Sequence, residues 1–255
     1  MLRPRLIPCL LIHNGGLVKT VNFGSPKYVG DPLNAVRIFN EKEVDELLVL
    51  DIDATRLNRQ PDEKLIEKLA TESRMPLCYG GGVNSVEQIC RLIGLGVEKV
   101  AVGAAAVYSP TLLAAAAERV GSQSVVAVID VKRSPTVGAY EVYTHNGTLR
   151  ANLDPASLAR TLQDYGVGEI VINSIDRDGT LQGYDLELAE RIKAVASIPI
   201  TILGGAGRIS DIENLISRFP QVGAAAGSLF VFKGKYRAVL INYPTAEERD
   251  ALTYD

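Results

Sequence analysis

Short apolar runs alternate with amphipathic stretches along most of the chain. The runs are rich in Val and Ile, which is typical of strands buried on both faces of a parallel sheet. The amphipathic stretches have the spacing of helices that bury one side. The pattern predicts eight strands: Arg5–Leu11, Glu46–Asp53, Met75–Tyr79, Lys99–Val102, Val125–Asp130, Glu169–Asn173, Ile198–Leu203 and Gly223–Ala226.

Helices are predicted between these strands. The first begins at Asp31-Pro32, where Asp is suited to the N-cap and Pro to the first helical position. The others are predicted at Asp62–Glu72, Ser85–Leu95, Pro110–Arg119, Asp154–Tyr165, Leu186–Val195 and Ser210–Arg218. Strands that alternate with helices lie parallel, joined by right-handed crossovers. Eight such strands in 255 residues predict one α/β domain, residues 1–255, folded as a (β/α)8 TIM barrel.

An internal repeat supports a closed barrel. Glu46–Asp53 resembles Glu169–Asp176, and Met75–Gly82 resembles Ile198–Gly205, both at an offset of 123 residues. We interpret the chain as two half-barrel repeats, which predicts two equivalent ligand sites. One segment departs from this pattern: Tyr236–Pro244, within an atypical C-terminal segment 236–255, is predicted to be extended where a barrel would end on a helix.

Bulk properties exclude several classes of function. A net charge of −3 gives no electrostatic case for a nucleic-acid partner. The three cysteines and two histidines have neither a disulfide nor a zinc spacing, so we expect reduced thiols, no metal and no cofactor. No apolar run reaches the length of a membrane span, and the N-terminal run lacks a signal-peptide pattern. We expect a cytoplasmic protein that does not interact with membranes.

Polar residues follow several predicted strands, at the end where such folds place their chemistry. Asp130 ends the fifth strand and is either a catalytic acid or base or the cap of a loop. Lys19 either steadies a phosphate or is simply solvated. Three more carboxylates lie at strand ends and can act as acids or bases or bind ligand hydroxyls: Asp51, Asp176 and Asp178. The last two could also belong only to a turn, which Asp and Gly favour.

Glycine-rich loops follow the third and seventh predicted strands. Such loops let backbone N–H groups wrap an anion, although tight turns also need glycine. Their symmetric placement favours two phosphate sites that bind a phosphorylated small molecule across the barrel mouth. The candidate residues are Gly81, Gly82 and Gly103 in one half, and Gly179, Gly204, Gly205, Gly207, Gly227 and Ser228 in the other.

Four charged residues begin predicted strands at the opposite end of the barrel: Arg5, Glu46, Lys99 and Glu169. Two cations and two anions can neutralise one another as a ring across the barrel. Residues at this end usually serve stability. The ring is therefore either a structural plug or a gate on an axial conduit.

Together these motifs resemble the cyclase subunit of imidazole glycerol phosphate synthase over about residues 1–232. The matching stretches are Pro8–Leu10, Val18–Phe23, Gly30–Pro32, Asp45–Leu47, Gly80–Val83, Tyr143–His145, Asp176–Gly179 and Gly204–Gly207. The resemblance implies a barrel that docks by its bottom face onto a glutaminase subunit. It also implies that ammonia from glutamine passes a gate formed by the four charged residues and travels up the barrel, which favours the gate over the plug.

The mouth departs from the family pattern. The family has a catalytic Asp at the end of the first strand, paired with the one matched here by Asp130, but this chain has Leu11. A leucine cannot transfer a proton, and a positioned acid or base typically contributes about 10²–10⁴-fold. The neighbours His13 and Asn14 and the pair Gly103-Ala104 also differ from the family's residues.

These departures resemble divergent cyclase-like proteins of surface-polysaccharide (lipopolysaccharide O-antigen) pathways, as do Phe23–Pro32 and Tyr236–Pro244. The resemblance implies that such a barrel relays ammonia to a third protein, an amidotransferase that converts a sugar's acetamido group to acetamidino. The alternatives are a genuine cyclase of histidine biosynthesis, a non-catalytic phosphate-binding regulator of a glutaminase, and, more remotely, a sugar-phosphate isomerase.

Overall fold

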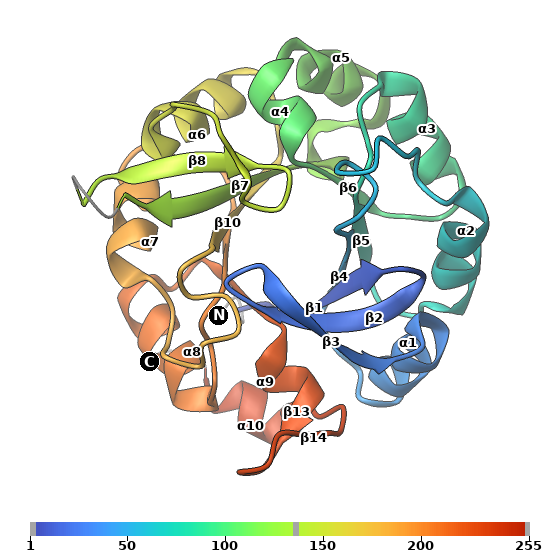
Figure 1. The fold of residues 1–255 in the computed structure, drawn as a ribbon, viewed down its shortest axis with the longest axis vertical. Coiled ribbons are helices and arrows are strands. Elements are labelled where there is room, and N and C mark those ends of the chain that lie inside the picture. Colours follow the sequence, from blue (N-terminus) through green and yellow to red (C-terminus); the bar gives the residue numbers. More distant parts are fainter. Residues whose placement is uncertain (1–3, 135–137, 253–255) are drawn as a thin grey trace.

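The computed structural model describes residues 4–134 and 138–252 and folds as a closed barrel of eight parallel strands surrounded by helices (Figure 1). Each strand pairs with the next, and β7 closes the ring against β10 over six residue pairs, from Glu169 with Val126 to Ser174 with Val131. This is the predicted (β/α)8 barrel. Its strands are β1 (Leu6–His13), β4 (Leu47–Asp51), β5 (Leu77–Gly80), β6 (Lys99–Val102), β7 (Val125–Arg133), β10 (Glu169–Ser174), β11 (Ile200–Leu203) and β12 (Gly223–Ala226).

The helices of the outer ring begin where the sequence places their caps. Asp31, Asp62, Asp154 and Asp185 each accept a hydrogen bond from the backbone three residues on, which satisfies one of the free N–H groups at a helix start. The ring consists of α1 (Pro32–Glu41), α2 (Glu63–Glu72), α3 (Val86–Gly94), α5 (Thr111–Val120), α6 (Pro155–Asp164), α7 (Leu186–Lys193) and α8 (Ile209–Arg218). Two short helices, α4 (Ala104–Tyr108) and α9 (Ser228–Val231), and the 3-10 turn η1 (Ser122–Ser124) complete it.

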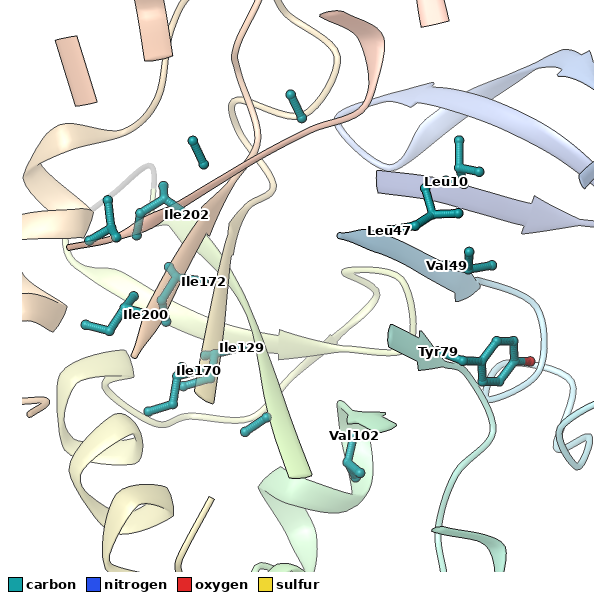
Figure 2. Packing of buried hydrophobic residues seen from close by; sticks show 14 of the residues in the cluster. Leu10, Leu47, Val49, Tyr79, Val102, Ile129, Ile170, Ile172, Ile200 and Ile202 are labelled. Atoms are coloured by element: carbon teal, nitrogen blue, oxygen red, sulfur yellow. The ribbon is translucent and has the colours of Figure 1, made fainter. Parts of the chain in front are cut away.

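The core has two layers because every barrel strand is buried on both faces. Alternate strand residues point outward and pack against the helices, as Leu10, Val49, Ile129 and Ile172 do in Figure 2. The intervening residues fill the inside of the barrel with an apolar cluster: Ile7, Cys9, Leu48, Cys78, Ala101, Val126, Val128, Val171, Leu203 and Ala225. This double burial explains why the strands lack an alternating polar pattern.

Two hairpins above the barrel mouth were not predicted. β1 continues to His13 and turns into β2 (Gly16–Val21) and β3 (Gly24–Gly30), while β7 continues to Arg133 and turns into β8 (Tyr140–Thr144) and β9 (Leu149–Arg150). Asn14-Gly15 has both φ angles positive, as a type I′ turn requires. This Asn-Gly pair was therefore a hairpin signal in the sequence. Each half-barrel carries one hairpin after its first strand, which extends the predicted repeat.

The C-terminal segment contains no helix from Tyr236 to Pro244. It forms a small antiparallel hairpin, β13 (Phe232–Lys233) with β14 (Ala238–Val239), and an extended stretch before α10 (Ala246–Asp250). The hydroxyl of Tyr243 donates to the Leu6 carbonyl and accepts from the Asp45 backbone N–H. The segment thus reaches the bottom of the barrel, and its last residues, 253–255, lie outside the described residues.

Candidate functional site at the barrel mouth

Two neighbouring cavities open at the carboxyl ends of the strands, and each is lined by residues of both half-barrels. The first is lined by the loops after β4, β5 and β6, including Asp51, Gly81, Gly82 and Gly103. The second is lined by the loops after β10, β11 and β12 together with β2, including Lys19, Asp178, Gly179, Gly204, Gly205, Gly227 and Ser228. The structure therefore brings most of the predicted ligand residues together in two places.

The glycine turns of the two cavities have matching conformations. Gly81 and Gly204 have φ of +125° and +101°, and Gly103 and Gly227 both have φ of −99° where α4 and α9 begin. A Cβ on Gly81 would lie 2.5 Å from the Asp51 carbonyl oxygen, so the fold itself requires that glycine. A Cβ on Gly103 would meet nothing within 4 Å. Packing therefore does not explain Gly103.

Asp130 and Leu11 occupy equivalent places in the two halves. Asp130 pairs in register with Asn173 on β10, and Leu11 pairs with Leu50 on β4. All four side chains line the first cavity, and Asn173 and Leu11 also line the second. The amide of Asn173 donates to Asp130 Oδ1 at 3.0 Å. One half of the mouth thus presents a hydrogen-bonded carboxylate where the other presents two leucines.

Burial raises the pKa of Asp130 to about 7, an effect that the Asn173 hydrogen bond opposes and the Asp178 carboxylate reinforces. A carboxyl with such a pKa is half protonated near neutrality and can serve as a general acid or base. Perturbed carboxyls of this kind concentrate at functional sites. The Leu11 side chain offers no proton to a reaction at the same place.

Lys19 lies buried in the second cavity. Its ammonium donates to the Cys9 carbonyl, and burial lowers the pKa of Lys19 while the Cys9 thiol and the Asp178 carboxylate oppose that shift. Asp178 accepts from Thr20 Oγ1 at 2.6 Å and from the Phe23 N–H at 3.1 Å, although burial raises the pKa of Asp178. Lys19 is therefore not a solvated surface lysine, and Asp178 ties the β2–β3 hairpin to the loop after β10.

Two of the predicted ligand residues lie outside both cavities. Asp176 accepts from the Arg133 N–H at 2.7 Å, and the Gly207 N–H donates to Asp211 at 2.8 Å. Both residues hold their loops in place. Asp51 lines the first cavity but also accepts from the Asp53 and Ala54 N–H groups, so one of its oxygens caps the loop.

Sequence reasoning missed Phe23 and Asn173. Phe23 lines both cavities from the turn between β2 and β3, where its φ is +62°, a conformation uncommon for a large side chain. Phe23 belongs to two of the family-like stretches, but they did not reveal its place at the mouth because the hairpin was not predicted. Asn173 could have been found: it lies at the offset of 123 residues from Leu50, on the inner face of its strand.

The four charged residues at the barrel bottom form a closed ring. Arg5 contacts Glu46 at 2.5 Å and Glu169 at 2.8 Å, and Lys99 contacts Glu46 at 2.8 Å and Glu169 at 2.9 Å. Thr201 also donates to Glu169 at 2.6 Å. Burial alone would raise the pKa of Glu169, but Arg5, Lys99 and Thr201 outweigh it and lower that pKa to about 2. Glu169 therefore stays ionised near neutral pH, and the ring joins both glutamates to both cations at the bottom of the barrel.

Within 4–134 and 138–252, no group of three or more His, Cys, Asp or Glu side chains is placed to hold a metal ion. Over the same residues, no helix is long and apolar enough to cross a membrane.

The fold and the mouth define a pseudo-symmetric (β/α)8 barrel with paired, glycine-walled cavities and a charged ring beneath them. Comparison with known sequences identifies the family. The profile described as "Histidine biosynthesis protein" matches residues 5–237. The chain belongs to this family, and its relatives place it with the HisF-type cyclase subunits of imidazole glycerol phosphate synthase.

The relatives match over more than nine-tenths of their length. The chain is 51% identical over 254 residues to "Putative imidazole glycerol phosphate synthase subunit HisF" of Leptospira interrogans, covering 100% of both chains. It is 53% identical to "Putative imidazole glycerol phosphate synthase subunit hisF3" of Vibrio vulnificus, covering 98% of this chain and 96% of the relative. It is 38% identical to "Imidazole glycerol phosphate synthase subunit HisF" of Lactiplantibacillus plantarum, covering 91% and 92%.

Proposed function

We propose that this barrel is an ammonia-relay subunit that has lost the cyclase reaction of its family. In this proposal a glutaminase docks on the bottom face and releases ammonia beneath the charged ring. The ammonia crosses the barrel and leaves at the mouth. A third protein, an amidotransferase, then uses it to convert a sugar's acetamido group to acetamidino in surface-polysaccharide synthesis.

The observation that carries the proposal is the leucine at position 11. Leu11 faces the same cavity as Asp130, at the equivalent position of the other half-barrel. A reaction that needs proton transfer on both sides of a substrate has only Asp130 on one side. Losing a positioned acid or base costs about 10²–10⁴-fold in rate. Leu50 beside Leu11 supplies no substitute.

The interior of the barrel, between the charged ring and the mouth, is suited to an uncharged molecule such as ammonia. It is lined by apolar side chains, and burial raises the pKa of the Cys78 thiol well above its usual value, so this thiol carries no charge. A charged ammonium ion in such surroundings pays a desolvation penalty of several kcal/mol, whereas neutral ammonia does not. The ring of Arg5, Glu46, Lys99 and Glu169 is the gate that we propose ammonia must open.

We assign the cavities at the mouth to a phosphorylated small molecule. The buried Lys19 ammonium supplies positive charge to the second cavity, and the glycine turns of both cavities let backbone N–H groups approach an anion. The free space at Gly103 is consistent with this assignment. Asp130 is then retained to bind ligand hydroxyls or to hold Asn173, and not as half of an acid–base pair.

A genuine cyclase of histidine biosynthesis is the second candidate. Family membership speaks for it more directly than for a relay, and the raised pKa of Asp130 is suited to general acid or base catalysis. A non-catalytic regulator of a glutaminase is a third reading.

Deleting the gene in its source organism separates these functions. We expect the deletion strain to grow without histidine, and mass spectrometry of its surface polysaccharide to show acetamido sugar where the parent strain has acetamidino. Re-expression of the wild-type chain should restore the acetamidino group. A strain that needs histidine and keeps its sugars unchanged would establish the cyclase instead, and loss of neither would favour the regulator.

A further inference from the structure

A cationic, aromatic surface lies beside the mouth on elements that the proposed chemistry does not use. It consists of β3 and the β13–β14 hairpin, which we call the hairpin surface: Lys27, Tyr28, Lys233, Lys235, Tyr236, Arg237 and Leu240. Figure 1 shows the β13–β14 hairpin projecting from the rim of the barrel on the side of β3. β13 begins directly after α9, whose first residue Ser228 lines the second cavity.

Two cations hold the elements of the hairpin surface together. Lys27 Nζ lies 5.0 Å from the centre of the Phe232 ring, and the Arg237 guanidinium lies 4.8 Å from it. Both are at cation–π distance. β3 in turn pairs with β2, which carries Lys19. The hairpin surface is therefore linked through β3 and β2 to residues that line the mouth.

The charge of the hairpin surface is unbalanced. Lys27, Lys233, Lys235 and Arg237 form no ion pair with any carboxylate in the part of the chain that the structure describes. Arginines on the helices do pair, as Arg91 does with Glu63 and Arg218 with Glu190. No Asp or Glu occurs between Arg218 and Glu247, although the whole chain has a net charge of −3. A local excess of positive charge steers a negatively charged partner toward this place.

Large apolar side chains accompany these cations. Tyr236 is 90% exposed, Tyr28 66% and Leu240 54%. Exposed tyrosines next to arginine are typical of the centres of protein interfaces. A nucleic acid is a polyanion, and the net charge of −3 on the whole chain would repel it. The combination fits a protein with an acidic surface.

We propose that the hairpin surface docks the acidic face of the protein that receives ammonia at the mouth. This inference rests on the relay function proposed above, because it names the place where the acceptor binds. Bound there, the acceptor lies beside the mouth, while the bottom of the barrel remains free for the glutaminase. Ammonia can then pass between the proteins without entering the solvent.

Photo-crosslinking in the source organism tests this surface. Benzoylphenylalanine replaces Tyr236 in the full-length chain, and adducts are identified by mass spectrometry. We expect an adduct with an ammonia-consuming enzyme of acidic surface, and no such adduct when the crosslinker replaces Ile38, which is 38% exposed on α1.

Charge reversal provides the matched control. Lys233→Glu with Lys235→Glu should lower the adduct yield at least tenfold, while Lys64→Glu with Lys68→Glu on α2, the same change in charge, should leave it unchanged. All variants should co-purify with the glutaminase. An adduct with the glutaminase, nucleic acid or lipid, no protein adduct, or a yield that ignores the reversal would overturn the hairpin surface. If the deletion strain loses its acetamidino sugar but no acceptor crosslinks, the relay stands and only this docking surface is wrong.

Discussion

Single residues decide what chemistry the mouth can support. Leu11 and Asp130 stand at equivalent positions, and so do Leu50 and Asn173. The apolar pair needs no explanation by itself, since leucine is an ordinary core residue. The polar pair does, because burying a carboxyl is costly unless the protein uses it or compensates it. A single amide hydrogen bond is modest compensation, so the ionised form of Asp130 destabilises the folded protein near neutral pH.

This cost of ionising a buried carboxyl predicts a pH-dependent effect of Asp130→Asn on stability. The folded-state pKa of Asp130 is raised from 3.8 to about 7, so its burial costs nothing at low pH and costs more as the pH rises from about 4 through 7. The Asn oxygen can still accept from Asn173. At pH 8 we expect the variant to be more stable than the wild type by about 2–4 kcal/mol.

Urea unfolding at pH 4 and pH 8 measures this difference. At pH 4 the two proteins should have nearly equal free energies of unfolding. An equal gain at both pH values would show that the effect is one of packing. A loss of stability at pH 8 would contradict the expectation that ionised Asp130 destabilises the fold.

At the scale of secondary-structure elements, four strands meet in the charged ring. Arg5 and Glu46 stand just before β1 and β4, and Lys99 and Glu169 begin β6 and β10. Each ion pair joins elements far apart in the sequence. The ring therefore holds the barrel bottom together whether or not it is also a gate.

Removing Lys99 should destabilise the fold. In Lys99→Ala, Glu46 and Glu169 remain buried and depend on Arg5, with Thr201 contacting Glu169. Leaving a buried charge partly unpaired costs about 3 kcal/mol. The pKa of Glu169 is lowered to about 2, so its contribution is present above pH 4.5 and is lost as the pH falls toward 2.

Acid unfolding checks this expectation. The difference between wild type and Lys99→Ala should be largest above pH 4.5 and shrink below it. A difference that does not change with pH would mean that Lys99 acts through its aliphatic stem, which Lys99→Met preserves. If the ring is also a gate, the variant in complex with the glutaminase should alter glutamine-dependent product formation and leave ammonia-dependent formation unchanged.

At the scale of the whole molecule, the sequence predicted the barrel well and its mouth less well. The strands buried on both faces and the repeat at 123 residues determine the barrel, because they leave one way to bury every strand. The strand β3 was missed because its exposed residues, such as Lys27 and Tyr28, carry no apolar pattern. Asp176 and Gly207 lie outside both cavities, and their contacts with Arg133 and Asp211 are ones that spacing alone does not reveal.

We propose that the barrel lost cyclisation when position 11 lost its carboxylate. The most direct measurement is turnover of the substrate of imidazole glycerol phosphate synthase with free ammonia, for wild type and Leu11→Asp, with Leu11→Asn as a control of similar shape. We predict no turnover by the wild type or Leu11→Asn, and turnover by Leu11→Asp about 10²-fold or more above the wild type. Robust turnover by the wild-type chain would show that the barrel is a working cyclase and would contradict the loss of this reaction.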